Sequence, residues 1–462
     1  MTNPTPQPQC RALFIAAPAS GQGKTTLTAA LARLLRNQGR RVRVFKTGPD
    51  YLDPQVLGQA AGVPAEQLDL WMAGEDWCRE RLQEAARESD FILVEGVMGL
   101  FDGEPSSADL AALFGIPMAI VMDVKGMAQT VAPLVTGLVA HRDDLNVIGL
   151  IANACSTARH RELIEQALPV HIPLLATVPR DPAIALPERH LGLVQAAEIR
   201  DDLEVRFEAG AAVLAESGLL AHLEQLPLVR FPAPAAPPPA PTGNERPLAG
   251  QRIGVARDEA FSFTYEPNLD LLRAMGAEVS FFSPLHDAHL PACDALWLPG
   301  GYPELHAAGL AANAGMKADI RRHFEADKPI LAECGGLMYC LDTLTDQQDL
   351  THDMLGLLPG QGAMRGRRGC QGMQTAVFPE GEVRAHAHHR SRAEGTPEPI
   401  GHGRRQRHPA PGEAIYRVRG LTATYLHLFF PNNPEAVARL FLPMAERQTS
   451  ASTQRTETTP CN

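Results

Sequence analysis

Aromatic residues make up only 5% of the 462-residue sequence, which also has no apolar run of about 18 residues and no CxxC pair of cysteines. The missing apolar run argues against a membrane-spanning helix, and we find no signal peptide. The eight cysteines, at positions 10, 78, 155, 293, 334, 340, 370 and 461, are scattered along the chain. We therefore expect a soluble protein of a reducing compartment, the cytoplasm.

Basic residues are outnumbered as well. The formal net charge is −11, from 42 Lys and Arg against 53 Asp and Glu. This balance argues against a nucleic acid or an anionic membrane as the main partner, since both carry negative charge. A small-molecule substrate is the better expectation.

Length and composition predict more than one domain, because 462 residues with 45% apolar content exceed one ordinary core. The proline-rich stretch FPAPAAPPPAP cannot join a packed core and predicts a linker. Apolar strand-like runs alternate with helical stretches on both sides of it. This pattern predicts two α/β domains, the first with a mostly parallel sheet and helices on both faces. The predicted boundaries are a disordered tail at 1–9, domains at 10–228 and 251–446 joined by a linker at 229–250, and a disordered tail at 447–462.

A phosphate-binding loop is predicted at PASGQGKTT, residues 18–26, between an apolar strand and a helix whose leucines repeat about every 3.6 residues. Its glycines would let backbone N–H groups approach phosphate oxygens, while the lysine and the following hydroxyl would meet phosphate and Mg²⁺. Pro18 stands where the usual motif has its first glycine, so the loop is a variant. Asn153, after a later strand, is a candidate for reading the nucleobase or for capping a turn. The predicted ATP-binding residues are Gly21, Gly23, Lys24, Thr25, Thr26 and Asn153.

Acidic residues follow two further strands. TGPDYLDP at 47–54 places Asp50 and Asp53 just past a strand, where α/β sheets bind ligands, so the two could orient a substrate or Mg²⁺-bound water, with Tyr51 as a flat contact. An Asp/Pro turn explains the stretch equally well. Glu95 ends the strand at 91–94 and is nominated, with Thr25, as a Mg²⁺ contact. Asp102 is expected further into the same pocket.

A nucleophilic cysteine is predicted at PILAECGGLMYC, residues 329–340, because an apolar strand, two glycines and a helical stretch at 337–344 surround Cys334. At a helix N-terminus the dipole would favour the thiolate, and the N–H of Gly335 could donate to an oxyanion. The glycine turn PGGYPE at 299–304, with Gly301, could complete this oxyanion hole. The alternatives are a buried core cysteine and a plain tight turn.

A general base for that cysteine is predicted at His427, in the strand-like run TATYLHLFF at 422–430. A histidine satisfied within the core is the alternative. The stretch AHAHHRS at 385–391 holds three histidines, but we assign it no metal because no cysteine or carboxylate lies at metal-ligand spacing. Residues 392–412, rich in Arg, Gly and Pro, are expected to form a mobile loop.

Together these motifs predict two coupled reactions. The first half would phosphorylate a carboxylate with ATP, and the second would release ammonia from glutamine through a thioester at Cys334. The ammonia would then attack the acyl phosphate and form an amide.

Over nearly its full length the sequence resembles the cobyrinic acid or hydrogenobyrinic acid a,c-diamide synthase family of cobalamin biosynthesis. The resemblance rests on ASGQGKTT, KTGPDYLDP, VEGVMGLFDG, LPERHLGL, PGGYPE, AECGGLMYC and TATYLHL, in that order. LPERHLGL best separates this family from the related cobyric acid synthases.

The resemblance implies a class I glutamine amidotransferase domain in the second half, with Cys334 as nucleophile and His427 as its partner. It implies an ATP-dependent amide ligase in the first half, acting on the a and c acetate groups of a tetrapyrrole acid with ATP, Mg²⁺ and glutamine. A homodimer is a further expectation. The implied substrate-binding residues are Asp50, Tyr51, Leu52, Glu95 and Asp102.

The sequence departs from that pattern in two places. Class I glutaminases usually carry Glu two residues after the histidine, where this chain has Phe429, so Cys334 and His427 are predicted to act as a dyad. Where the family tends to read GHEFHYS, AHAHHRS keeps His386, His389 and Ser391 but loses the other residues, which indicates altered glutaminase geometry. Two alternative functions stay open: amidation of another tetrapyrrole acid such as nickel-sirohydrochlorin, and a non-catalytic P-loop switch protein.

Overall fold

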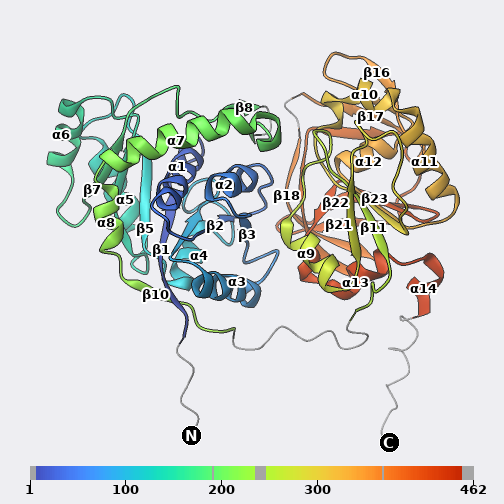
Figure 1. The fold of residues 1–462 in the computed structure, drawn as a ribbon, viewed down its shortest axis with the longest axis horizontal. Coiled ribbons are helices and arrows are strands. Elements are labelled where there is room, and N and C mark those ends of the chain that lie inside the picture. Colours follow the sequence, from blue (N-terminus) through green and yellow to red (C-terminus); the bar gives the residue numbers. More distant parts are fainter. Residues whose placement is uncertain (1–6, 190–191, 235–245, 367–368, 450–462) are drawn as a thin grey trace, which may run out of the picture. The chain divides into compact units, whose positions relative to one another are not determined.

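The structure, a computed structural model, describes residues 7–189, 192–234, 246–366 and 369–449. The chain divides into two compact units, Met1–Pro238 and Pro239–Asn462 (Figure 1). Parts of four predicted segments lie outside the described residues: 1–6 of the first tail, 190–191 of LPERHLGL, 235–245 of the linker and 450–462 of the second tail.

An eight-stranded sheet forms the centre of the first unit. Its apolar runs are buried on both faces, as expected of parallel strands covered by helices. One short strand, β10 (Leu228–Arg230), pairs antiparallel with the start of β1. The parallel strands, in spatial order, are β3 (Glu66–Leu68), β2 (Val42–Thr47), β4 (Phe91–Glu95), β1 (Gln9–Ala16), β5 (Met118–Asp123), β6 (Val147–Asn153) and β7 (Leu174–Val178).

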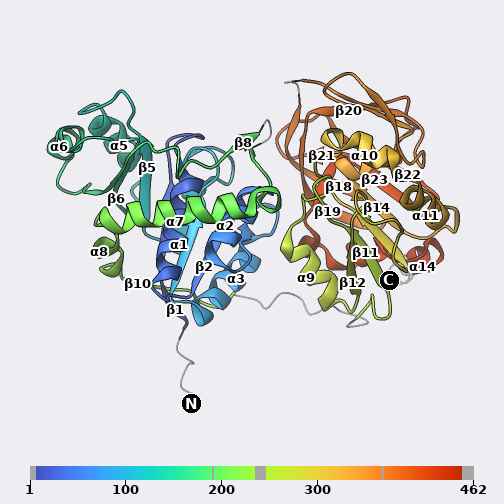
Figure 2. The same cartoon turned by 45° about the horizontal axis from the view of Figure 1, so that its top comes forward.

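Helices cover both faces of this sheet, which confirms the predicted fold class (Figures 1 and 2). Helices α1 (Lys24–Asn37), α2 (Asp53–Ala61) and α7 (Arg200–Glu216) pack together on one face. The other face carries α3 (Glu75–Glu88), α4 (Ser107–Phe114), α5 (Val131–Ala140) and α6 (Ala158–Ala167), whose apolar residues share one core with β1, β4 and β5. The smaller elements are β8 (Glu188–Arg189), β9 (Gly192–Leu193), η1 (Ala196–Ile199) and α8 (Leu219–Glu224).

The second unit is built on a ten-stranded mixed sheet. Five strands are parallel and include the one that leads into Cys334, and the other five run antiparallel. In spatial order they are β12 (Glu278–Phe282), β11 (Arg252–Ala256), β13 (Ala295–Leu298), β14 (Ile330–Glu333), β23 (Leu421–Thr424), β22 (Pro411–Val418), β21 (Gly401–Arg405), β18 (Cys370–Phe378), β19 (Gly381–His389) and β24 (Leu426–Leu428).

A small second sheet and several helices complete this unit. The small sheet has the order β16 (Thr351–Asp353), β15 (Thr343–Thr345), β17 (Gln361–Met364) and β20 (Ser391–Glu394). The helices are α9 (Glu266–Ala274), η2 (Pro303–Leu305), α10 (Ala307–Ala312), α11 (Ala314–Glu325), α12 (Gly335–Cys340), η3 (Phe430–Asn432), α13 (Pro434–Leu440) and α14 (Met444–Thr449).

Two local predictions in this unit were wrong. Residues 392–412 do not form a mobile loop: they complete β20, form β21 and begin β22. Their composition favours turns, but the neighbouring strands β18 and β22 supply the hydrogen-bonding partners that hold β21 in the sheet. The helical stretch predicted at 337–344 ends at Cys340, and β15 follows because it pairs with β16 and β17.

Element ends also extend past the predicted domain edges. Strand β1 begins at Gln9, β10 ends at Arg230 and α14 reaches Thr449. The sheet of the first unit thus takes in one residue of the predicted tail and two of the predicted linker.

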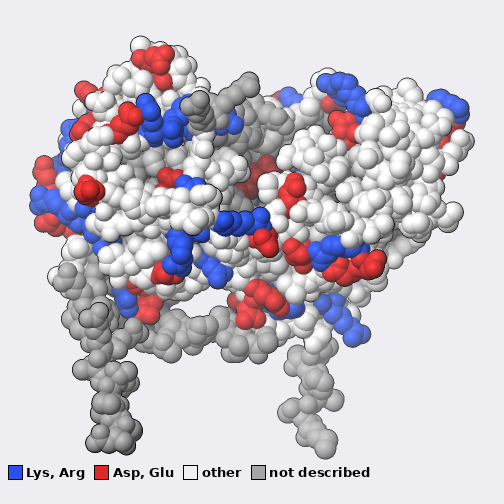
Figure 3. Space-filling view, turned by 180° about the vertical axis from the view of Figure 1, so that it is seen from behind, with Lys and Arg blue, Asp and Glu red and all other residues white. Residues whose placement is uncertain are grey.

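Charged residues of both signs lie interspersed on the face shown in Figure 3. Many charged side chains of the protein pair with the opposite sign, as Arg41 does with Asp90 and Arg252 with Asp294, both at 3.0 Å. Among the residues that the structure describes, no helix is both long and apolar enough to span a bilayer.

Candidate active sites

The phosphate loop joins the end of β1 to the start of α1, as the sequence predicts. Gly23 caps the helix with a left-handed backbone (φ 91°), and Gly21 is also left-handed (φ 74°). Asn153, at the end of β6, donates from its side-chain amide to the Gln22 carbonyl (2.9 Å) and lies against Gly23, where a Cβ would meet it. Glycine is therefore required at position 23 for conformation and for space. The backbone N–H groups in the first turn of α1 could therefore bind an anion.

Lys24 ends this loop, and its ammonium group donates to backbone carbonyls of the protein itself. Its Nζ donates to the carbonyls of Ala19 (3.1 Å) and Met98 (2.6 Å). Burial, with the positive charge of Lys46 nearby, lowers the pKa of Lys24 to about 8. Phosphate oxygens would replace these carbonyls and restore the ordinary lysine pKa, because a neighbouring anion favours the charged form.

A buried cluster of charged and hydroxyl groups lies beside the loop, where β2 and β4 end. Thr25 Oγ1 donates to Glu95 Oε1 (2.8 Å) and lies 3.2 Å from Asp53 Oδ2. Lys46 Nζ contacts both carboxylates, at 2.5 Å from Glu95 and 2.7 Å from Asp53. Burial alone would lower the pKa of Lys46, but these two carboxylates raise it well above its usual value. The cluster therefore holds one fixed positive charge between two negative ones.

The predicted Mg²⁺ contacts, Thr25 and Glu95, are thus brought together, and their surroundings fit a divalent cation. Glu95 is fully buried, and its Oε2 has no hydrogen-bond partner within the described part of the chain. Two carboxylates against one ammonium group leave an excess of negative charge. Hydroxyl and carboxylate oxygens are the ligands that Mg²⁺ prefers.

The predicted substrate residues gather at the same edge of the sheet. Asp50 Oδ1 accepts from the N–H groups of Leu52 and Asp53, both at 3.0 Å, so the Asp turn exists and also starts α2. Burial, with the nearby charge of Asp53, raises the pKa of Asp50 to about 7. Tyr51 and Leu52 are buried here, and Asp102 Oδ2 accepts from the Gly99 N–H (2.9 Å). Thr26 is half-buried on the first turn of α1.

The second site centres on Cys334, at the junction of β14 and α12. Its backbone has φ 46° and ψ −101°, a strained conformation for a residue with a side chain. The turn is held because the Cys334 N–H donates to the Thr424 carbonyl (2.8 Å) in the neighbouring strand β23. The predicted strand, turn and helix thus form a sharp elbow that projects the thiol beyond the end of the sheet.

Glycine backbones surround this elbow. A Cβ at Gly300 would collide with the His427 ring and lie 3.3 Å from the Cys334 Cβ, so Gly300 lies between the two predicted catalytic side chains. A Cβ at Gly335 would lie 3.0 Å from the Gly301 nitrogen. The two N–H groups predicted to bind the oxyanion, those of Gly301 and Gly335, therefore belong to adjacent backbone segments.

His427 lies in β24, directly opposite His386 of β19. Its side chain is buried, and burial together with His386, His388 and His389 lowers its pKa well below the usual value. Burial similarly lowers the pKa of His386 to about 3 and of His388 to about 4. The imidazoles are thus neutral at physiological pH, the form that a general base needs.

Cys334 differs from the expectation in one respect. Complete burial of the thiol, with Glu304 nearby, raises its pKa well above the usual value, whereas the sequence predicted a stabilised thiolate. The backbone N–H of Gly335 favours the thiolate, but the loss of water outweighs it. A neutral thiol beside a neutral imidazole needs proton transfer when the substrate arrives.

In a comparison with known proteins, each half of the chain matches a protein-family model. Residues 13–194 match the CobQ/CobB/MinD/ParA nucleotide binding domain, and residues 252–435 match the CobB/CobQ-like glutamine amidotransferase domain. The chain is 52% identical to the hydrogenobyrinate a,c-diamide synthase of Stutzerimonas stutzeri over 94% of this chain and 99% of that protein. The chain belongs to the cobyrinate and hydrogenobyrinate a,c-diamide synthase family.

Two further relatives support this membership. The hydrogenobyrinate a,c-diamide synthase of Pseudomonas aeruginosa is 49% identical over 95% of this chain and 98% of its own length. The cobyrinate a,c-diamide synthase of Herminiimonas arsenicoxydans is 45% identical over 96% of this chain and 99% of its own. The resemblance found in the motifs is thereby confirmed, and the chain is an amidating ligase with nucleotide-binding and glutamine amidotransferase domains.

Two residues that sequence reasoning missed are Lys46 and Glu333, which precede the predicted motif residues at strand ends. Glu333 accepts hydrogen bonds from Trp297 Nε1 (3.0 Å) and from the Leu428 N–H (2.9 Å), next to His427. Burial raises the pKa of Glu333 to about 8. Phe429, at the position of the missing Glu, is buried and packs edge-on against Tyr265. Glu333 therefore positions β24, the strand that carries His427, through a hydrogen bond to the backbone of Leu428.

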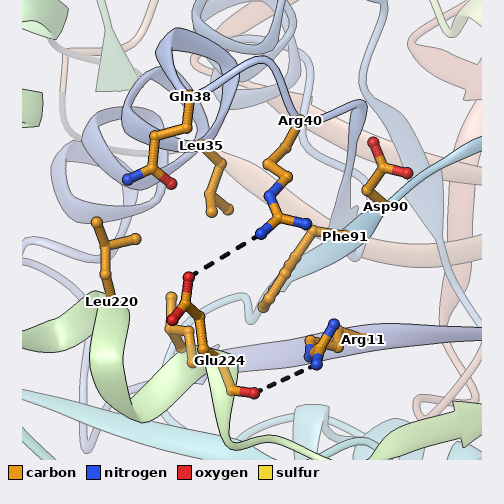
Figure 4. Close-up of a pocket in the computed structure, with 9 residues that line it drawn as sticks. Arg11, Leu35, Gln38, Arg40, Asp90, Phe91, Leu220 and Glu224 are labelled. Carbon is orange, nitrogen blue, oxygen red and sulfur yellow. Dashed lines mark hydrogen bonds and ion pairs between the residues drawn. The ribbon is translucent and has the colours of Figure 1, made fainter.

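A separate pocket in the first unit lies at the opposite end of the strands (Figure 4). It is lined by Arg11 and Phe91, at the starts of β1 and β4, and by residues of α1, α8 and the loop after α1. Arg11 donates to the Glu224 carbonyl (3.3 Å), and Arg40 lies 4.0 Å from the Glu224 carboxylate. Ligands of parallel sheets bind at the carboxyl ends of the strands, so we assign this pocket no role.

ATP affinity should fall as the pH rises through about 8, because Lys24 then loses its proton in the free protein and nucleotide binding must restore it. Phosphate groups themselves lose their last proton near pH 6, well below this range. We expect a loss of up to about tenfold per pH unit above pH 8, measured by calorimetric titration. Lys24→Arg should give a flat profile, since a guanidinium stays charged. A flat profile for the unchanged protein would contradict the lowered pKa.

Lys46→Met should destabilise the first unit by about 3–5 kcal/mol, because it leaves the buried Glu95 and the half-buried Asp53 without their counter-charge. Calorimetric unfolding would measure the effect, and added Mg²⁺ should restore part of it. The matched control is Arg252→Met, which removes an exposed partner of Asp294 and should cost about 0–1 kcal/mol. Equal losses in both variants would show that the Lys46 cluster is not a buried network.

Glu333→Gln should lower glutaminase activity and cost about 1–3 kcal/mol, because the amide offers one acceptor oxygen to two buried N–H donors. Synthesis with free ammonia should persist, since the change lies in the second unit. Glu325→Gln, on the exposed side of α11, is the control and should stay within about 0.5 kcal/mol. Unchanged glutamine hydrolysis in Glu333→Gln would contradict the view that Glu333 positions the strand that carries His427.

Proposed function

We propose that this chain uses ATP and glutamine to amidate the a and c acetate carboxylates of hydrogenobyrinic acid. One observation carries the proposal: this member of the diamide synthase family has both a phosphate-binding loop and a cysteine elbow beside a buried histidine. The two relatives at 52% and 49% identity bear the hydrogenobyrinate name, which favours the cobalt-free acid over cobyrinic acid.

The first unit activates the carboxylate. The triphosphate lies at the N-terminus of α1, and Lys24 exchanges its two carbonyl partners for phosphate oxygens. A substrate carboxylate oxygen attacks the γ-phosphorus, the bond to ADP breaks, and an acyl phosphate results. Thr25 and Glu95 would hold Mg²⁺, which neutralises phosphate charge when bound. The Asp50 turn presents Tyr51 and Leu52 to the substrate, and Asp102 lines the same pocket.

The second unit supplies ammonia. His427 takes the proton of the Cys334 thiol, and the sulfur attacks the side-chain amide carbon of glutamine. The N–H groups of Gly301 and Gly335 hold the resulting oxyanion. The imidazolium returns its proton to the leaving nitrogen, ammonia departs, and water releases glutamate from the thioester. The ammonia displaces phosphate from the acyl phosphate and leaves an amide.

The cytoplasm is the proposed location. The seven cysteines that the structure describes are free thiols, and six of them are buried. This state suits a reducing compartment.

Cys334→Ala should abolish amidation with glutamine but retain it with ammonia, because only the second unit uses the thiol. Lys24→Ala should abolish both, because neither nitrogen donor replaces the acyl phosphate. Mass spectrometry of products from hydrogenobyrinic and cobyrinic acid, incubated in parallel with ATP and Mg²⁺, measures both effects. Each amidation exchanges OH for NH₂ and is read as a separate mass step.

The outcomes separate the alternatives. Doubly amidated product from hydrogenobyrinic acid alone supports the proposal, and product from cobyrinic acid alone reverses the choice of acid. Loss of ammonia-dependent synthesis in Cys334→Ala would overturn the division of labour. ATP hydrolysis without product from either acid would favour another tetrapyrrole acid, and nucleotide-dependent self-association without glutaminase activity would favour a P-loop switch protein.

A further inference from the structure

A second cluster of side chains that could bind a metal lies in the amidotransferase unit. One of its members, His389, directly follows His388, whose carbonyl borders Cys334. Cys370 begins β18, His389 ends β19, and Glu413 lies near the start of β22. One sulfur, one imidazole nitrogen and one carboxylate oxygen from these residues lie within 4.8 Å of one another, the one such group found among the described residues. In the sequence, no cysteine or carboxylate lies at metal-ligand spacing from the 385–391 stretch, but the sheet brings Cys370 and Glu413 to His389.

The strand pairing builds this cluster. Cys370 and His389 are directly opposite each other in the β18 and β19 ladder, so their side chains project from the same face. Gln374 connects Glu413, the third residue of the cluster, to Cys370. Its Oε1 accepts from the Glu413 N–H (2.8 Å), and its Nε2 lies 4.0 Å from the Cys370 sulfur. Three strands thus converge on one point through ordinary sheet geometry.

His389 is oriented as a metal ligand would be. Its Nδ1 lies 3.0 Å from the Ser391 carbonyl, which only accepts, so Nδ1 carries the ring proton. Metal-binding histidines usually donate their other N–H to such a carbonyl or carboxylate. The Tyr425 ring stacks on the imidazole with centroids 4.0 Å apart and fixes its plane.

The other ring nitrogen points into the cluster. His389 is 9% exposed, and its Nε2 has no hydrogen-bond partner in the part of the chain that the structure describes. It lies 3.4 Å from Glu413 Oε2, so in the neutral ring two lone-pair atoms face each other. A cation between them, or a proton on Nε2, removes this conflict.

We propose that Cys370, His389 and Glu413 bind one thiophilic divalent cation, with Zn²⁺ as the probe. Thiolate, imidazole and carboxylate are the ligands that zinc takes in proteins, at about 2.0–2.3 Å, and tetrahedral ligands then lie about 3.3–3.8 Å apart. The three atoms, which now lie within 4.8 Å of one another, would move closer together by rotation of their side chains. Cys370 and Glu413 are half-buried, so water can fill the fourth position.

The cation would brace the strand that borders the glutaminase nucleophile. The carbonyl of His388, the residue before His389, lies 3.9 Å from the Cys334 sulfur. The site is nevertheless distinct from the catalytic pair, and it does not depend on which acid the enzyme amidates.

Metal content and cobalt spectra of the full-length protein test the proposal. Cys334→Ala serves as the parent, so that the nucleophile cannot bind metal, and the protein is stripped by a chelator and reloaded with Zn²⁺ or Co²⁺. We expect one equivalent of Zn²⁺, a thiolate-to-Co²⁺ charge-transfer absorption, and a higher unfolding temperature with metal. In this parent, Cys370→Ser should lose the charge-transfer absorption, and Glu413→Gln should lose stoichiometric binding.

The matched control is Cys293→Ser. Cys293 is also a buried cysteine beside a histidine, with its sulfur 3.9 Å from His323 Nδ1, but it lies outside the three-residue cluster. This variant should keep the metal and its spectrum. The proposal is overturned if the parent binds no metal, which would leave a protonated His389 paired with Glu413, or if Cys370→Ser and Glu413→Gln bind it unchanged. Loss of metal in Cys293→Ser would overturn it as well.

Discussion

The close approach of backbone segments around Cys334 is the constraint on which the second unit depends. Gly300, Gly301, Gly335 and Gly336 each lie where a Cβ would meet a neighbouring segment. This packing and the pairing of β14 with β23 hold Cys334 at φ 46°, directly after the end of β14. The same packing brings the two candidate oxyanion donors and the histidine strand to the sulfur.

The two sites treat burial in opposite ways. The first keeps buried groups charged, with Lys46 between Asp53 and Glu95, and so offers fixed charges to a nucleotide and its cation. The second keeps the Cys334 thiol and the surrounding imidazoles neutral, because burial penalises their ionised forms. A neutral pocket suits the side-chain amide of glutamine, which is itself uncharged.

Both sites use the carboxyl ends of parallel strands. In the first unit β4 and β6 end at Glu95 and Asn153, and in the second β14 ends just before Cys334. The antiparallel strands of the second unit add a different contribution. They place His386 opposite His427, so that histidines of two adjacent strands lie near the elbow. They also place Cys370 opposite His389.

The sequence by itself determined the fold class, the phosphate loop and the cysteine elbow, because each is a run of adjacent residues whose chemistry and spacing are local. It also determined the family, which the relatives confirm. Only the tertiary structure decided that Lys46 pairs with Glu95 and that Glu333 accepts from the Leu428 N–H, partners that lie 49 and 95 residues away in the chain. The same holds for the strands within 392–412 and for the raised pKa of Cys334. Strand pairing and desolvation depend on residues that are neighbours in space but distant in the sequence, and a local sequence pattern does not identify them.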